Sequence, residues 1–139
     1  MSTFDPEEWV EVAELCCDRI EGLSGEALLR TALNRAYYAA LLCVKRRIEQ
    51  AHGEGSIPRF QTHAAILATL RTGGRAFTGI RDGLRSLQTF RERADYELRS
   101  TPLIWGVVHS QVRMSRELIR TRIKSLPDAE FRRLVISSN

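Results

Sequence analysis

The chain has 139 residues, a size typical of one domain that folds around its own core without a metal or a disulfide. Its composition, 43% hydrophobic and 27% charged, excludes a disordered or low-complexity chain. The longest uncharged apolar run, Ala36 to Val44, is far shorter than the roughly 20 residues that a membrane-spanning helix needs. No secretion signal is visible, and the cysteines (Cys16, Cys17 and Cys43) lack metal-ligand spacing. We therefore expect one cytoplasmic domain, residues 1–139, with no metal and no cofactor.

The charge is distributed unevenly along the chain. Of the 21 basic side chains 19 are Arg, since only Lys45 and Lys124 are lysines, and the net charge is +4. Up to Leu70, 7 basic minus 10 acidic side chains give −3, and beyond it 14 minus 7 give +7. Guanidinium groups bind phosphate through a bidentate fork that Lys lacks. We therefore expect either that the second half binds an anionic partner or that an acidic and a basic surface meet when the protein assembles. The alternative is a solvated surface of mixed charge.

The first helix is predicted to begin at Asp5-Pro6-Glu7-Glu8, which provides an N-cap, a proline at the first helical position and a capping-box acid. It is expected to end near Gly22 and to have an acidic outer face. Apolar spacing predicts an inner stripe of Trp9, Val12, Ala13, Cys16 and Ile20.

The second helix is predicted to start at Ser24 and to last to about Gln50, where Gly53 and Gly55 end it. From Leu28 to Val44 it is apolar on nearly all sides. This pattern is typical of a central helix that several neighbours cover.

Shorter helices follow a loop at residues 53–60. Thr62 is expected to cap a third helix that ends before Gly73-Gly74. A fourth helix is expected from about Phe77, with an inner stripe of Ile80, Leu84, Leu87, Ala94 and Leu98.

Thr101-Pro102 predicts the start of a fifth helix, and Leu126-Pro127-Asp128 that of a short terminal one. The fifth helix would turn Ile104, Val108, Val112, Ile119 and Ile123 inward. The predicted fold is all-α, an up-and-down bundle of four to five main helices joined by short loops.

Arg91 interrupts the apolar stripe of the fourth predicted helix. A buried guanidinium is costly, so it must be paired, line a pocket or lie at a subunit contact. Asp95 is one turn further on, with Tyr96 beside it, and both are candidate partners. The alternative is an ordinary surface pair of Arg91 and Asp95 in the less favourable order for the helix dipole.

A second interruption, Asn34-Arg-Ala-Tyr-Tyr38, lies inside the apolar central helix. Asn34 and Tyr38 share one face, and Arg35 carries the only charge nearby. Two tyrosines beside an Asn and an Arg can form a buried hydrogen-bond network. Such a network is either part of a site or a satisfied piece of core.

The fifth predicted helix carries a basic column of residues spaced by one turn each. Stacked like charges repel one another, and phosphates relieve that repulsion. No aromatic side chains alternate with them, so contact with a nucleic acid would be to its backbone. The column consists of His109, Arg113, Arg116, Arg120 and Lys124.

Common catalytic motifs are absent: the sequence has no P-loop, HExxH, CxxC or Ser-His-Asp arrangement that can be placed. The three histidines, His52, His63 and His109, each taken singly fit a surface position.

Two segments together resemble the HEPN superfamily. Asn34-Arg-Ala-Tyr-Tyr-Ala-Ala in the second helix is followed by Arg91-Glu-Arg-Ala-Asp-Tyr96 in the fourth. The chain is most similar to small stand-alone HEPN proteins with an R-x-x-A-D-Y signature, and Thr62-His63 fits that subgroup. The resemblance covers roughly residues 24–125. It implies a four-to-five-helix bundle that forms a homodimer with its motif helices close together.

Many HEPN proteins are metal-independent RNases, often toxins of toxin–antitoxin or antiviral modules encoded beside a nucleotidyltransferase. Their usual motif is an Arg followed, after a short spacer, by a His. The Arg stabilises charge on the scissile phosphate and the His moves a proton. At the positions where this His would stand after Arg91, the sequence has Tyr96, Glu97 and Leu98, so the motif His is missing. His63 would replace it if the third helix packs against the fourth.

The resemblance thus implies a homodimer that binds RNA or nucleotide at a cleft around Arg91, in a toxin–antitoxin or phage-defence system, with endoribonuclease activity left open. The alternative is a non-catalytic HEPN subunit that scaffolds or regulates a partner protein such as a nucleotidyltransferase. A third possibility, which only the family resemblance suggests, is that a nucleotidyltransferase partner modifies Tyr96. The candidate catalytic residues are Arg91, Asp95, Tyr96 and His63. The candidate RNA or nucleotide contacts are Asn34, Arg35, Tyr38, Arg113, Arg116 and Arg120.

Overall fold

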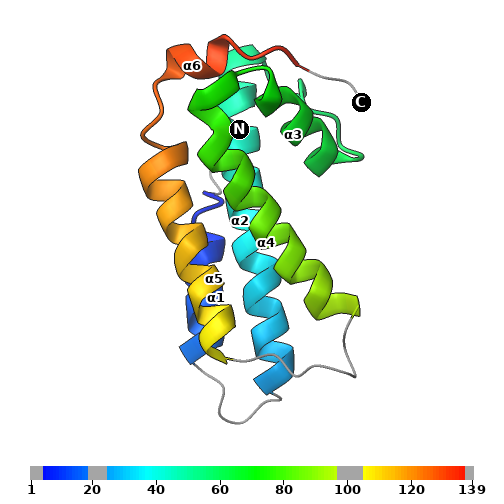
Figure 1. The fold of residues 1–139 in the computed structure, drawn as a ribbon, viewed down its shortest axis with the longest axis vertical. Coiled ribbons are helices and arrows are strands. Elements are labelled where there is room, and N and C mark those ends of the chain that lie inside the picture. Colours follow the sequence, from blue (N-terminus) through cyan, green and yellow to red (C-terminus); the bar gives the residue numbers. More distant parts are fainter. Residues whose placement is uncertain (1–4, 19–24, 97–104, 137–139) are drawn as a thin grey trace.

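The computed structural model describes residues 5–18, 25–96 and 105–136; at 18, 25–26, 94–96 and 105 it describes the backbone alone. Within these ranges the chain forms helices and no strand, which confirms the predicted all-α class (Figure 1). The α-helices are α1 (Glu8–Asp18), α2 (Gly25–His52), α3 (Thr62–Arg71), α4 (Thr78–Tyr96), α5 (Trp105–Glu117) and α6 (Asp128–Arg132). A 3₁₀ turn, η1 (Gly74–Phe77), precedes α4, and a π-helical segment, η2 (Leu118–Ile123), continues α5.

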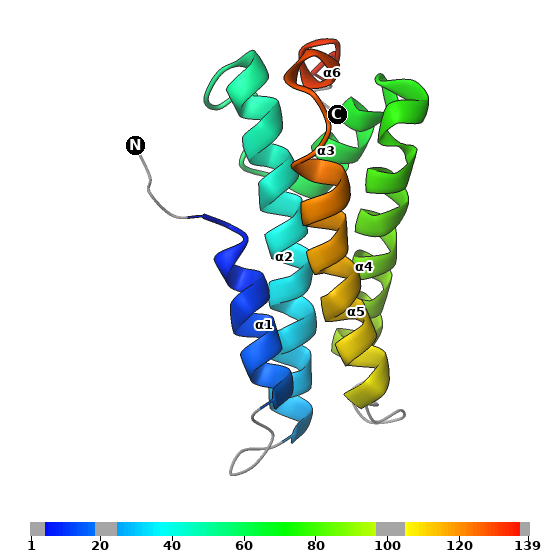
Figure 2. The same ribbon diagram turned by 90° about the vertical axis from the view of Figure 1, so that its left-hand side faces the viewer.

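Helix α2 forms the centre of the bundle and packs against α1, α4 and α5 (Figures 1 and 2). Helices α1, α2, α4 and α5 run roughly along the long axis, while α3 and α6 lie at the same end of the bundle. The nearly all-round apolar character of α2 follows from this position. Its alanines let the neighbouring helices approach closely, and Ala32, Ala36, Ala39 and Ala40 are fully buried. No helix in the described ranges has the length and apolar character that crossing a bilayer requires.

The start of α1 confirms the predicted cap, because the Asp5 carboxylate accepts a hydrogen bond of 3.0 Å from the backbone N–H of Glu7. The predicted inner stripe is wrong in part: Val12 is 40% exposed, whereas Val10 is 2% exposed. The buried line is Val10, Ala13 and Cys17. The predicted and the observed sets of residues both have helical spacing. The packing of α1 against α2 and α5 determines which set is buried. The expected position of Ile20 and the expected boundaries at Gly22 and Ser24 lie outside the described residues.

The connection from α2 to α3 agrees with the prediction at Gly53, whose φ of 112° ends α2 in the left-handed region. The predicted cap at Thr62 is wrong. Thr62 is already helical, and its hydroxyl donates back to the carbonyl oxygens of Pro58 and Arg59. Gln61 instead makes the turn, with a left-handed φ of 56°.

The predicted stripes of α4 and α5 are confirmed where the structure describes them, at Ile80, Leu84 and Leu87 and at Val108, Val112, Ile119 and Ile123. Ser115 is also fully buried, and its hydroxyl donates a hydrogen bond of 2.7 Å to the carbonyl oxygen of Ala36. The π-helical segment was not predicted. The expected positions of Ala94, Leu98, Thr101-Pro102 and Ile104 lie outside the described side chains.

Arg47 joins the end of η2 to α2. Its guanidinium donates to the carbonyl oxygens of Ile123 at 2.6 Å and Leu126 at 2.7 Å, and to the Asp128 carboxylate at 2.8 Å. It also lies 4.3 Å from the ring centroid of Phe131 in α6. One side chain thus satisfies carbonyls that the helix end leaves free and fixes where the chain turns toward α6.

Candidate functional site

A cluster of four side chains lies where α2, α3 and α4 meet. The Tyr37 hydroxyl is 2.6 Å from Nδ1 of His63. The guanidinium carbon of Arg91 is 4.7 Å from the ring centroid of Tyr37 and 5.4 Å from that of Tyr38. We call these residues, Tyr37, Tyr38, His63 and Arg91, the Tyr37 cluster. Two of the predicted catalytic residues, on different helices, therefore contact the same tyrosine.

Arg91 faces inward, as its place on the apolar stripe predicts. Two aromatic faces compensate its charge, an arrangement that contributes about 0.5–2 kcal/mol depending on desolvation. Its Nε atom is buried and has no hydrogen-bond partner among the described residues. The predicted partners Asp95 and Tyr96 are in the last turn of α4, where the structure describes the backbone alone.

Burial controls the protonation of the cluster. It lowers the pKa of His63 below the ordinary 6.5; Arg91 and Arg85 add to that shift and Glu92 opposes it. Burial also raises the pKa of Tyr37 to about 12. At neutral pH the pair is therefore a neutral imidazole and a protonated phenol.

Further aromatic contacts extend the cluster toward α1. Tyr38 packs edge-on against Tyr37, with ring centroids 4.9 Å apart, and against Trp9 at 6.3 Å. The guanidinium of Arg35 lies 4.7 Å from the ring centroid of Trp9. Trp9 and Arg35 thus connect to the cluster through Tyr38. Asn34 instead lines an open hollow of about 240 Å³ with Arg30, Thr31 and Arg35.

The sequence pattern singles out Tyr38, which shares a face with Asn34, and does not identify Tyr37 as a site residue. Tyr37 is 2% exposed and lies in the middle of the apolar face of α2. A buried phenol needs a hydrogen-bond partner, and that requirement was the available signal. The identity of the partner, His63, follows only from the packing of α3.

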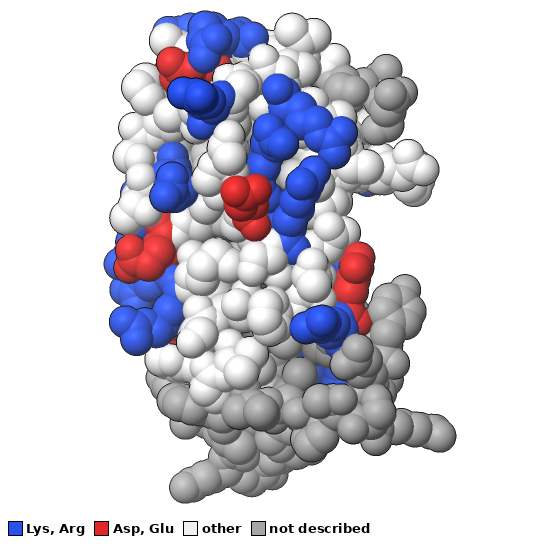
Figure 3. Space-filling model, viewed as in Figure 1, with Lys and Arg blue, Asp and Glu red and all other residues white. Residues whose placement is uncertain are grey.

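Positive charge surrounds the α4 side of the molecule. Figure 3 shows Lys and Arg side chains gathered over α4 and around α6. Arg85 of α4 is exposed, yet close enough to His63 to lower its pKa. An anion that approaches this face therefore meets a positive field.

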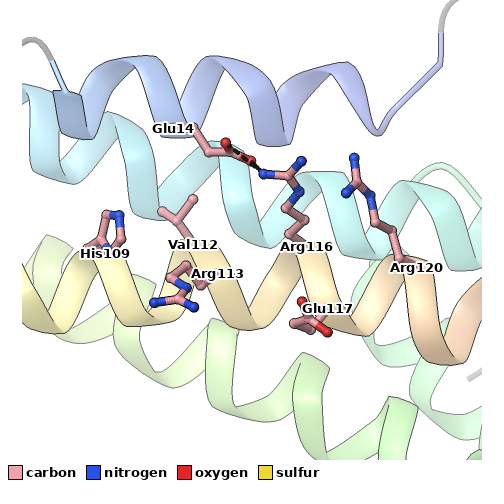
Figure 4. A pocket seen from close by; sticks show the side chains of 7 residues that line it. All are labelled: Glu14, His109, Val112, Arg113, Arg116, Glu117 and Arg120. Atoms are coloured by element: carbon pink, nitrogen blue, oxygen red, sulfur yellow. Dashed lines mark hydrogen bonds and ion pairs between the residues drawn. The ribbon is translucent and has the colours of Figure 1, made fainter.

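Arg116 and Arg120 of the basic column point toward α1 in the same chain, whereas Arg113 points away from it (Figure 4). Arg116 lies 3.1 Å from the Glu14 carboxylate, and Arg120 lies 3.1 Å from that of Glu7. Lys124 also forms an ion pair with Glu7. The hydrogen bond from Lys124 is the main reason why the pKa of Glu7 is lowered. The acidic and basic surfaces anticipated from the sequence thus meet within one protomer.

A shallow hollow of about 340 Å³ lies along the column. Arg116 and Arg120 remain 41% and 54% exposed at their side chains, with their charge already offset by a carboxylate. Arg113 is exposed and makes no ion pair with the described residues. It is therefore the cation of this column that is most available to a phosphate. The hollow is lined by Glu14, His109, Val112, Arg113, Arg116, Glu117 and Arg120.

The cysteines do not form a site in the structure. All three are free thiols, and burial raises the pKa of Cys43 to about 12. Over residues 5–18, 25–96 and 105–136 no three His, Cys, Asp or Glu side chains come together as metal ligands would.

Comparison with protein families gives one match. A family model described as HEPN domain matches residues 6–125, which span α1 to η2 and include the Tyr37 cluster and the basic column. The match begins earlier than the resemblance seen in the motifs, so α1 is part of the family's domain. Comparisons with curated proteins and with solved structures gave no significant match.

Proposed function

The chain belongs to the HEPN domain family, and from that premise we propose that it binds RNA or a nucleotide, with the Tyr37 cluster as its phosphate-contacting site. HEPN domains are generally RNA-binding or RNase-related. One observation carries the proposal: His63 of α3 and Arg91 of α4 contact the same tyrosine. The fold thereby assembles an Arg and a His although the motif His is absent from α4.

Each side chain of the site has a defined part in the proposal. The Arg91 guanidinium offers planar donors to a phosphate, while the aromatic faces beneath it keep it in place. Asp95 and Tyr96, in the last turn of α4, are proposed as further polar contacts of the ligand. Arg35, Tyr38 and Asn34 act as accessory residues on α2. The exposed Arg113, with Arg116 and Arg120, contacts the nucleic-acid backbone further away.

The stronger form of the proposal is metal-independent RNA cleavage by a homodimer. In that chemistry Arg91 stabilises charge on the scissile phosphate, and His63 moves a proton of the 2′-hydroxyl or the leaving group. HEPN domains often dimerise, and a dimer would bring two Arg91 side chains to one cleft. A toxin–antitoxin or phage-defence system is the setting we propose for this activity.

The decisive experiment incubates the purified protein with labelled tRNA and mRNA in the presence of EDTA. We expect cleavage that leaves 2′,3′-cyclic phosphate ends and that is lost in Arg91→Ala. Arg93→Ala is the matched control, since Arg93 is an exposed arginine on the same helix. Equal RNA binding and equal cleavage by the wild type and Arg91→Ala would contradict the proposal. Binding without cleavage would retain the RNA-binding form and reject the RNase.

A second candidate is a non-catalytic subunit that scaffolds a partner protein such as a nucleotidyltransferase. Apolar side chains exposed on the bundle surface favour it: Val12 and Leu15 of α1 are 40% and 53% exposed, and Val107 of α5 is 42% exposed. An apolar protein interface withstands salt, whereas phosphate binding weakens steeply with the logarithm of salt concentration. A salt titration of each complex, with Leu15→Lys as the interface variant, separates the two functions.

A further inference from the structure

The hydrogen bond between Tyr37 and His63 has a direction that the surroundings determine. Tyr37 is 2% exposed and, with a pKa of about 12, keeps its hydroxyl proton at neutral pH. Nδ1 of His63, at 2.6 Å, is the partner of this hydroxyl among the described residues. If Nδ1 carried a proton and donated it, the Tyr37 hydrogen would be buried without an acceptor there. Tyr37 is therefore the donor and Nδ1 the acceptor.

This direction fixes the tautomer of His63. A neutral imidazole has one protonated nitrogen, so an accepting Nδ1 leaves the proton on Nε2. The charged groups that face the ring are Arg91, Arg85 and Glu92, all on α4, and the two arginines oppose a second proton. The Nε2 atom is buried and has no hydrogen-bond partner among the described residues. The Nε atom of Arg91 is likewise buried and without a hydrogen-bond partner among the described residues.

We propose that Tyr37 is a positioning residue that holds His63 as a neutral hydrogen-bond donor at Nε2, so that a phosphate group bound beside Arg91 meets an N–H of His63 and not a lone pair. This inference rests on the proposed function and specifies how its site selects a ligand. With Nδ1 engaged and Nε2 protonated, His63 has no free lone pair with which to act as a general base. The site accordingly takes a phosphodiester or phosphate group. A cleavage step in which Nδ1 of His63 acts as the general base first requires the Tyr37 hydrogen bond to break.

The tautomer is measured directly by NMR of the imidazole nitrogens in uniformly ¹⁵N-labelled full-length protein. The chain has three histidines, so the spectrum of His63→Gln assigns the His63 signals. In the wild type we expect a protonated Nε2 and an unprotonated Nδ1 at neutral pH. A protonated Nδ1 in the wild type would overturn the proposal without any variant.

Two tyrosine variants test the role of the hydroxyl. Tyr37→Phe removes the donor to Nδ1, so His63 should populate both tautomers and its pKa should rise, because a contact that favours the neutral ring is gone. Tyr38→Phe is the matched control; the structure gives the Tyr38 hydroxyl no contact with His63, so it should leave both signals unchanged. An unchanged tautomer and pKa in a folded Tyr37→Phe would reject the positioning role.

Binding of a single-stranded RNA oligonucleotide and of inorganic phosphate completes the test. We expect each to shift the His63 Nε2–H resonance, and Tyr37→Phe to weaken RNA binding about threefold to tenfold, as for one weakened hydrogen bond. If Arg91→Ala abolishes RNA binding while Tyr37→Phe binds as the wild type does, the proposed function stands and this inference fails. If the tautomer is as expected but neither probe binds, the proposed function fails together with the ligand class assigned here.

Discussion

The hydroxyl of Tyr37 lies 2.6 Å from Nδ1 of His63, across 26 residues of sequence and between two helices. With Arg91 stacked on the same ring, this contact gives the bundle a His and an Arg in one place. In the proposed site, this contact between helices takes the place of a motif on a single helix. Its consequences can be tested one residue at a time.

Arg91→Lys separates charge from shape at the proposed site. Lys retains the positive charge but cannot stack a planar group on Tyr37 and Tyr38 or bind phosphate through a fork. We expect RNA affinity to fall by about tenfold for Arg91→Ala, with nearly the same loss for Arg91→Lys. Fluorescence anisotropy with labelled RNA at fixed salt measures this, with Arg93→Ala as control. Full affinity in Arg91→Lys would show that charge alone suffices.

His63 makes stability depend on pH in a defined direction. Its pKa in the folded protein is below the ordinary 6.5, so below pH 6.5 the unfolded chain binds more protons than the folded one. The contribution of His63 to the free energy of unfolding is therefore fully present above pH 6.5. It is lost as the pH falls from 6.5 through the pKa that His63 has in the folded protein. Urea unfolding between about pH 5 and 8 should show this decline.

The matched variants for that titration are His63→Gln, which should remove the decline, and His109→Gln, which should keep it. The lower limit avoids Glu7, whose lowered pKa adds a separate loss of stability as the pH falls below 4.5. An equal decline in both variants would show that another group is responsible.

The Glu14–Arg116 ion pair should be detectable by exchanging its charges. Glu14→Arg and Arg116→Glu each place like charges together, and the double variant restores attraction across α1 and α5. Because both side chains are more than a third exposed, we expect a coupling free energy of only about 0.5 kcal/mol. A double-mutant cycle in urea measures it, and a cycle that sums to zero would remove the pair as a contact in solution.

Arg113 and Arg116 should differ as RNA contacts because only Arg116 is paired with a carboxylate. Arg113→Ala should make the slope of log affinity against log salt concentration less steep by about 1, the value expected for the loss of one phosphate contact. Arg116→Ala should change this slope by less. Salt titrations of RNA binding by the two variants compare them directly. A larger effect at Arg116 would mean that RNA displaces Glu14.

Arg47→Ala should be the most destabilising of these changes. The side chain is 15% exposed, and it donates hydrogen bonds to the carbonyl oxygens of Ile123 and Leu126. Among the described residues no other side chain donates to these two oxygens. Loss of charged hydrogen bonds that cap a helix end predicts about 2–4 kcal/mol less stability. Urea unfolding measures this value, with exposed Arg46→Ala as the control. A loss similar to that of the control would show that water replaces the guanidinium.

Local signals predicted helix ends well where they act within one turn. Asp5 caps α1, and Gly53 ends α2, because a carboxylate cap and a left-handed glycine need only their neighbours in sequence. The same reasoning failed at Thr62, where the preceding Gln61 makes the turn. The apolar spacing also did not predict the π-helical segment that continues α5, because a single wider turn hardly changes the average period of the spacing.

The sequence by itself determined an all-α bundle with a buried second helix, because helical periodicity and capping are local properties of the chain. It also pointed to Arg91, and to His63 on the condition that the third helix packs against the fourth. Only the tertiary structure decided that these two meet at Tyr37 and that Arg116 meets Glu14. Such contacts depend on how each helix is rotated, and one position along a helix turns a side chain by about 100°. Two positions, or about 200°, separate a buried Val10 from an exposed Val12, and one position separates Tyr37 from Tyr38.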